Sequence, residues 1–256
     1  MEHFQLRHLY IIFIAAAIVA VLLLAKWLIF HYEWEVITAG PVVTALVAGV
    51  IFTVAIIFSG VLTDYKESEK IPGDLAASLG SLYSDIQFLQ VKDPKITDDL
   101  RMHVKGLLKV ILSNFERNVW EIDEIRSVLN HVAEDVNNLS KDGVAPPFII
   151  KMRNELTNID KLSYRIDTIM ETSFIPAAYN IAVIAMVAVL GVLAFTKMPS
   201  LYDGLLLFGS VSFILTSLLM LIKDMDNPFE YGKKSSADVD LTILFNLKKE
   251  FEGRDG

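Results

Sequence analysis

The chain has 256 residues, of which 53% are hydrophobic, and a mean hydropathy of +0.46, which excludes an ordinary soluble protein. Its formal net charge is -8 and it has no basic cluster, so nucleic acid is not an expected partner, because phosphate binding needs lysine and arginine patches. It contains no cysteine, which excludes disulfides, thiolate nucleophiles and zinc–thiolate sites.

Four apolar segments are long enough to cross a bilayer, which takes about 20 helical residues. Three of them, residues 36–63, 172–196 and 204–222, contain no Asp, Glu, Lys or Arg. The first, residues 9–30, carries only Lys26, which we expect to extend toward the lipid head groups. This segment exceeds the roughly 7–15 apolar residues of a signal peptide, so we interpret it as a retained span. The sequence therefore predicts an all-α membrane protein with four transmembrane helices.

The even number of spans predicts which parts of the chain share a side of the membrane. The N-terminus, residues 64–171 and the tail 223–256 would lie together, and their lysines and arginines near the span ends indicate the cytoplasm. We thus expect spans 1 and 2 in residues 1–63, a helical cytoplasmic domain in 64–171, spans 3 and 4 in 172–222, and a cytoplasmic tail. The expected location is the cell membrane.

The second span carries small residues along one helical face, with two bulky apolar residues in the middle. Two interpretations of this face stay open, since small residues serve close helix packing in lipid as well as the lining of a pore. Neighbouring registers, such as Leu46, Val50 and Val54, stay open too. The face comprises Ala45, Ala48, Gly49, Phe52, Ile56, Ser59, Gly60 and Thr63.

Residues 98–141 and 149–169 each show apolar positions three or four apart, which is typical of amphipathic helices. We expect Thr97 to cap the first helix and Gly143 with the prolines at 146 and 147 to end it. If unbroken, that helix would be roughly 65 Å long. It therefore either projects far from the membrane or breaks near residues 113–118. About three helices make a thin core, so we expect the stripes to pack on neighbouring subunits as well.

The tail places Leu241, Leu244, Leu247 and Phe251 on one helical face. This helix either lies across an adjacent subunit or rests on the membrane surface.

Catalytic patterns are missing from the sequence. The five histidines have no metal-binding spacing, no phosphate-binding glycine loop occurs, and acidic clusters such as "EIDEI" fit a solvated helix face. We expect no catalytic residue, no cofactor, no metal site and no enzymatic activity. Two classes of function stay open: an oligomeric channel, or a non-conducting four-span scaffold or sensor whose cytoplasmic helices bind a partner.

Three motifs together resemble the bestrophin family. They are "YKESEKIPGDL" directly after the second span, "FIPAAYN" at 174–180 where the third span begins, and "DNPF" at 226–229 after the fourth. Each is weak alone, but their order within a four-span plan covers the whole chain. One departure is the segment "EYGKKSSADVD", which replaces the acidic run of the calcium-binding clasp in animal bestrophins. It supplies few of the six to eight oxygen ligands of a calcium site, so calcium gating is not expected.

The resemblance implies a homopentameric channel for monovalent ions, whose partners are its own copies, membrane lipid and permeant ions. The second span would line the axis, with Phe52, Ile56 and Ala48 at an apolar constriction. Selectivity between anions and cations stays open. Pore-lining residues would be Ala45, Gly49, Ser59 and Thr63, the cytoplasmic mouth Asp64 and Glu67, and the tail motif Asn227, Pro228 and Phe229.

Overall fold

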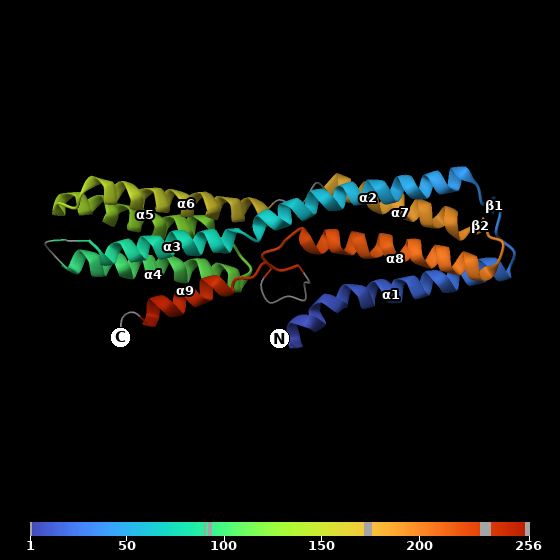
Figure 1. Cartoon of the computed structure of the whole chain (residues 1–256), viewed down its shortest axis with the longest axis horizontal. Helices are drawn as coiled ribbons and strands as arrows, with labels where there is room; N and C mark the ends of the chain where they lie inside the picture. Colours follow the sequence, from blue (N-terminus) through green and yellow to red (C-terminus); the bar gives the residue numbers. More distant parts are fainter. Residues whose placement is uncertain (1, 90, 92–93, 172–175, 231–236, 254–256) are drawn as a thin grey trace. The chain divides into compact units, whose positions relative to one another are not determined.

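The computed structural model describes residues 2–89, 91, 94–171, 176–230 and 237–253, which form two units (Figure 1). The membrane unit contains α1 (Glu2–His31), α2 (Pro41–Ser68), α7 (Pro176–Ala194) and α8 (Leu201–Met225), with the short strands β1 (Ile37–Thr38) and β2 (Thr196–Lys197). The last turn of α2 is counted with the second, helical unit. That unit contains α3 (Ile71–Gln87), α4 (Pro94–Arg117), α5 (Ile122–Asn138), the 3₁₀ turn η1 (Leu139–Asp142), α6 (Pro146–Glu171) and α9 (Thr242–Gly253).

The four apolar segments all form helices of membrane-spanning length and composition, which confirms the four-span prediction. The strands β1 and β2 pair in parallel, Ile37 opposite Thr196, and so join the α1–α2 and α7–α8 loops at one end of the unit. Figure 1 shows α1 beside α8. Gly209 permits this approach, because a Cβ added there would lie 3.2 Å from a methyl carbon of Leu23.

The helical unit buries the predicted stripe of α4 within one subunit. Leu100, Val104, Leu107 and Ile111 on α4 are all 0% exposed and share a core with side chains of α3, α5, α6 and α9. Five helices rather than the expected three build this core, so the α4 stripe is buried without a neighbouring subunit. Packing of the other stripes on neighbouring subunits stays a prediction. Val119, between α4 and α5, is 47% exposed.

The tail helix α9 also packs on its own subunit. Leu244, Leu247 and Phe251 are buried, Phe251 stacks on Tyr83 of α3 at 4.1 Å between ring centroids, and Leu247 lies against Gly80. Neither expected position of this apolar face, on an adjacent subunit or on the membrane surface, agrees with this packing.

Of the two alternatives for residues 98–141, the structure shows the break, since α4 ends at Arg117 and α5 begins at Ile122. Asn118 between them adopts a left-handed backbone with φ 53°, a conformation that asparagine tolerates better than most residues. The expected Thr97 cap was wrong, because α4 starts at Pro94 and the Thr97 hydroxyl donates to the Pro94 carbonyl at 2.7 Å. Pro94 already supplies the fixed φ that suits a first turn.

Candidate functional site

One face of α2 belongs to the core of the membrane unit. Val50, Val54 and Val61 are 8%, 0% and 2% exposed, and they cluster with buried side chains of α7 and α8. The alternative pore register through Leu46, Val50 and Val54 is therefore wrong, because two of its three residues are used inside the subunit.

The opposite face of α2 carries the residues predicted to line a pore. Phe52 and Ile56 are 67% and 57% exposed, and a Cβ added at Gly49 would meet no atom within 4 Å. A pore, lipid and a neighbouring subunit are all compatible with such exposure, so the pore assignment stays a prediction. The smaller members of the face, all exposed, are Ala45, Ala48, Gly49, Ser59, Gly60 and Thr63.

Hydroxyl groups on α2 donate to the helix itself. Thr53 donates to the Gly49 carbonyl and Thr63 to the Ser59 carbonyl, each at 2.9 Å. Because the single hydroxyl proton is used in this way, each exposed threonine can only accept hydrogen bonds from its surroundings.

A buried charged cluster at the loop end of the membrane unit was missed by the sequence analysis. Lys26 of α1 is 1% exposed, and its ammonium group donates to Glu35 at 2.5 Å. It also donates to the backbone carbonyls of Leu193 at 3.4 Å, and of Ala194 and Thr196 at 2.9 Å each. The prediction that Lys26 extends to the head groups was wrong, since the side chain points into the protein.

This arrangement places a cation at the C-terminal end of α7, where helix carbonyls lack intrahelical partners and the helix dipole is negative. The lysine stem packs on α8, since a Cβ added at Gly204 would lie 3.5 Å from the Lys26 Cε atom, an ordinary contact distance. The fold brings these partners together from α1, the α1–α2 loop and the segment from the end of α7 to β2.

The two carboxylates expected at a cytoplasmic pore mouth lie in the last turns of α2. Asp64 and Glu67 are both exposed. Glu67 accepts a hydrogen bond from the Arg165 guanidinium of α6 at 3.0 Å. This partner of Glu67 lies 98 residues away along the chain.

The tail motif follows α8, which ends at Met225. Phe229 is 2% exposed and its ring lies 5.7 Å from the Phe115 ring in the core of the helical unit. Pro228 is buried, and Asn227 Oδ1 is buried with no hydrogen-bond partner among the described atoms. The motif's aromatic residue thus has a packing role. In the motif "FIPAAYN", Pro176 begins α7, and the residues before it, 172–175, lie outside the described residues. Residues 231–236 of the segment "EYGKKSSADVD" also lie outside the described residues.

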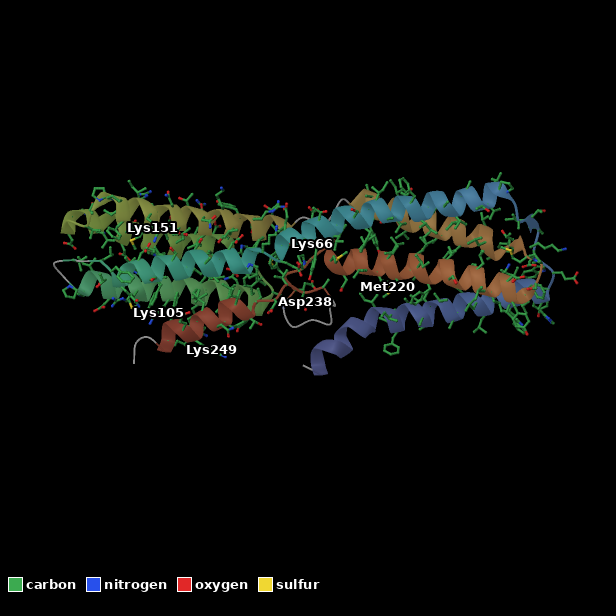
Figure 2. All side chains as sticks on the ribbon, viewed as in Figure 1. Lys66, Lys105, Lys151, Met220, Asp238 and Lys249 are labelled. Carbon is green, nitrogen blue, oxygen red and sulfur yellow. The ribbon has the colours of Figure 1, made fainter. Side chains whose placement is uncertain are left out.

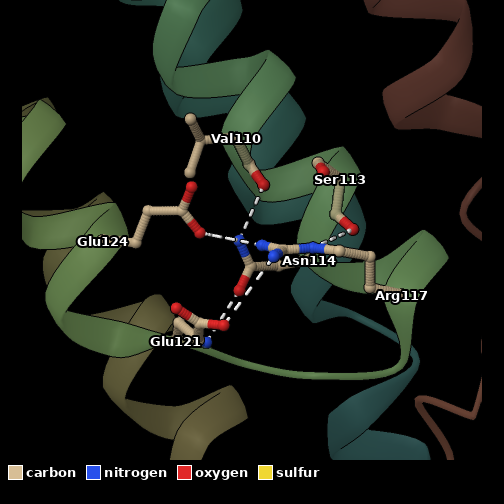
Figure 3. Close-up of polar contacts among 6 residues, drawn as sticks. All are labelled: Val110, Ser113, Asn114, Arg117, Glu121 and Glu124. Carbon is tan, nitrogen blue, oxygen red and sulfur yellow. Dashed lines mark hydrogen bonds and ion pairs between the residues drawn. The ribbon is translucent and has the colours of Figure 1, made fainter.

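A polar cluster fastens the break between α4 and α5 (Figure 3). Asn114, 0% exposed, donates to the Val110 carbonyl at 3.0 Å and to Glu124 at 3.1 Å, and accepts from the Glu121 backbone N–H at 2.7 Å. Arg117 donates to the same Glu124 carboxylate at 2.8 Å. One buried amide therefore satisfies backbone groups on both sides of the turn.

The cluster sets the protonation of Glu124. Its hydrogen bonds from Asn114 and then Arg117 lower the pKa of the Glu124 carboxyl below its ordinary value. A carboxyl with a lowered pKa stabilises the fold above its unfolded-state pKa, and that stabilisation is lost as the pH falls through the folded-state pKa. The turn should accordingly loosen in acid and not near neutral pH.

These features define an integral membrane protein with four spans and a separate helical unit. Among the described residues, no group of three or more histidine or acidic side chains is placed to hold a metal ion. The model of the Bestrophin-like domain matches residues 10–231, and the chain belongs to this family. No curated protein sequence matches the chain.

Solved structures with the same fold include bacterial bestrophin homologues. A variant of a bestrophin homologue from Klebsiella pneumoniae superposes with a TM-score of 0.78 at 13% identity, covering 92% of this chain and 96% of that one. The structure of this homologue that was phased with zinc gives a TM-score of 0.78 at 13% identity, covering 94% of this chain and 97% of that one. A second variant of the homologue gives a TM-score of 0.76 at 12% identity, covering 98% of this chain and 99% of that one. At these identities the likeness establishes the fold.

Proposed function

We propose that this chain is one subunit of a pentameric ion channel of the bestrophin type, with α2 of each subunit around a central pore. The observation that carries the proposal is the exposed face of α2. It presents small and hydroxyl-bearing residues, while the opposite face is held in the subunit core.

The exposed faces of α1 and α7 carry no serine or threonine, whereas α2 exposes Thr53, Ser59 and Thr63. On α1, large apolar side chains such as Phe13, Val21 and Leu24 are 68%, 66% and 63% exposed, which is the surface that acyl chains require. On α7, Ile181, Ile184 and Val187 are 60–68% exposed. Lipid is therefore the proposed partner of α1 and α7, and a face with hydroxyl groups such as that of α2 is better suited to narrow water-filled space.

Phe52 and Ile56, with Ala48 one turn before, form the proposed constriction. Five copies of these uncharged side chains around one axis would make an apolar ring, which closes by losing water and opens when it is wetted. Ala45, Gly49, Ser59 and Thr63 would line the wider parts of the pore.

The proposed mouth at Asp64 and Glu67 has a limited charge. A ring of free carboxylates concentrates cations, but the Glu67 carboxylate is paired with Arg165. This pairing favours weak selection by charge among monovalent ions. In this proposal the mouth, the termini and the helical unit face the cytoplasm, in the cell membrane, and no catalytic step is assigned to the chain.

The test combines the mass of the purified oligomer with ion flux into proteoliposomes. We expect five copies per particle and flux of monovalent ions, and reversal potentials in a salt gradient would then give the sign of the preferred ion. A particle of one or two copies without flux would overturn the proposal in favour of a non-conducting scaffold. The burial of the α4 stripe within one subunit leaves less surface for such a scaffold's partners.

A further inference from the structure

A cavity lies between α4 and α9 in the helical unit, on the side of α9 that carries Lys248. Its volume is about 170 Å³. Leu108 and Phe251, which are 1% and 2% exposed, form its apolar floor, and Gly106 lies in the wall on α4. Around them stand three lysines and one acid, Lys105, Lys109, Lys248 and Glu252. Figure 2 labels Lys105 on α4.

The charge of this cavity is opposite to that of the chain. Three ammonium groups and one carboxylate give a local charge of +2, in a protein with a net charge of -8. Lys105 and Lys109 are one helical turn apart on α4, an arrangement in which like charges repel. Among the described side chains, Lys109 and Lys248 have no ion-pair partner. An anion placed between the three lysines would relieve their repulsion.

One aromatic ring, that of Phe251, forms part of the wall, and it is backed by Tyr83. The Phe251 ring stacks on Tyr83, and the Lys105 ammonium lies 5.5 Å from the centroid of the Tyr83 ring. A planar apolar group entering the cavity would thus meet Phe251 and Leu108, while its charged end faced the ammonium groups. A cavity of roughly 150 Å³ holds a benzene ring, so the volume here suits one ring.

Gly106 is consistent with a ligand in this cavity. A glycine in the middle of a helix destabilises it relative to alanine. Close packing does not require this one, because a Cβ at position 106 would meet no atom within 4 Å. What the missing side chain leaves is the open volume beside Lys105 and Lys109.

We propose that the cavity between α4 and α9 binds a small organic phosphate monoester, with its ring on Phe251 and Leu108 and its phosphate held by Lys105, Lys109 and Lys248. A dianionic phosphate matches the local charge of +2. Because the site includes both helices, the bound ligand stabilises the docking of α9 on α4. The proposal does not depend on ion conduction.

The test is calorimetric titration of the full-length protein in detergent with three probes: phenyl phosphate, inorganic phosphate and phenol. We expect phenyl phosphate to bind most tightly and to raise the melting temperature, since a ligand of the folded state stabilises it. Equal binding of phenyl phosphate and inorganic phosphate would overturn the proposal, because lysines alone would then explain it. Binding of phenol as tight as that of phenyl phosphate would also overturn it.

Matched variants locate the site. The pair Lys109→Gln and Lys248→Gln, on partly or fully exposed side chains, should weaken phenyl phosphate roughly ten-fold or more without unfolding the protein. Gly106→Leu should abolish binding by filling the cavity. Lys249→Gln, an exposed lysine of α9 outside the cavity lining (Figure 2), should change nothing. If the lysine pair binds as the unaltered protein does, the site is not here, whatever the outcome for Gly106→Leu.

Discussion

Replacing Lys26 by methionine is expected to lower the free energy of unfolding of the membrane unit by about 3–5 kcal/mol, the cost of breaking a buried ion pair from one side. Methionine keeps the length of the side chain and removes the charge. The Glu35 carboxylate, 7% exposed, would then lie buried without its cation. The carbonyls of Ala194 and Thr196 would also lose their donor, at the end of α7 that needs one.

Unfolding in mixed detergent micelles, followed by circular dichroism, measures this loss. Glu35→Gln should cost less, because the lysine keeps its three carbonyl partners. The double variant should cost less than the sum of the single ones, since both remove the same ion pair. Lys197→Met is the matched control, an exposed lysine of β2 at the same end of the unit. A Lys26→Met protein as stable as the Lys197→Met protein would refute the structural role of the cluster.

Phe52→Ala is expected to raise the conductance of reconstituted protein severalfold, or to make it leak. The substitution removes an aromatic ring from each subunit at the proposed constriction, and a wider apolar ring holds water more readily. Phe52 is 67% exposed within the subunit, so its truncation should change folding stability by no more than about 0.5 kcal/mol. A change in current can then be attributed to the pore and not to misfolding.

Planar-bilayer recordings compare Phe52→Ala and Ile56→Ala with Ile184→Ala. The last residue is 68% exposed on α7, on a face proposed to contact lipid, and its truncation should leave the current unaltered. Unchanged currents from both α2 variants would remove Phe52 and Ile56 from the constriction.

The spans could be predicted because they follow from local composition, since an uncharged run of some twenty residues has one stable form in lipid. The helix break could be predicted only as one of two alternatives, because residues 113–117 still belong to α4 and the chain turns just after Arg117. The face of α2 was also predictable in part, since spacing of three and four separates Phe52 and Ile56 from Val50 and Val54.

Partners distant along the chain could not be predicted in this way. Lys26 lies near the end of an apolar run, where a lysine usually extends to the head groups, and its carbonyl partners are up to 170 residues away. The same holds for α9, whose apolar face fits a membrane surface as well as the core it joins. A charged residue with an acidic residue in the following loop, as Lys26 and Glu35 are, was the one available signal.

The water accessibility of α2 tests the central claim most directly, and the absence of native cysteine makes it practical. Single cysteines at positions 48, 52 and 56 would be treated with a charged methanethiosulfonate reagent in proteoliposomes during current recording. Cysteines at Val54, which is buried, and at Ile184, which faces outward from α7, are the controls. If α2 lines a pore, the three positions react and the current falls, while both controls stay unmodified. Labelling at 48, 52 and 56 no faster than at 184, with the current unaffected, would show that this face of α2 meets lipid or protein instead of a water-filled pore.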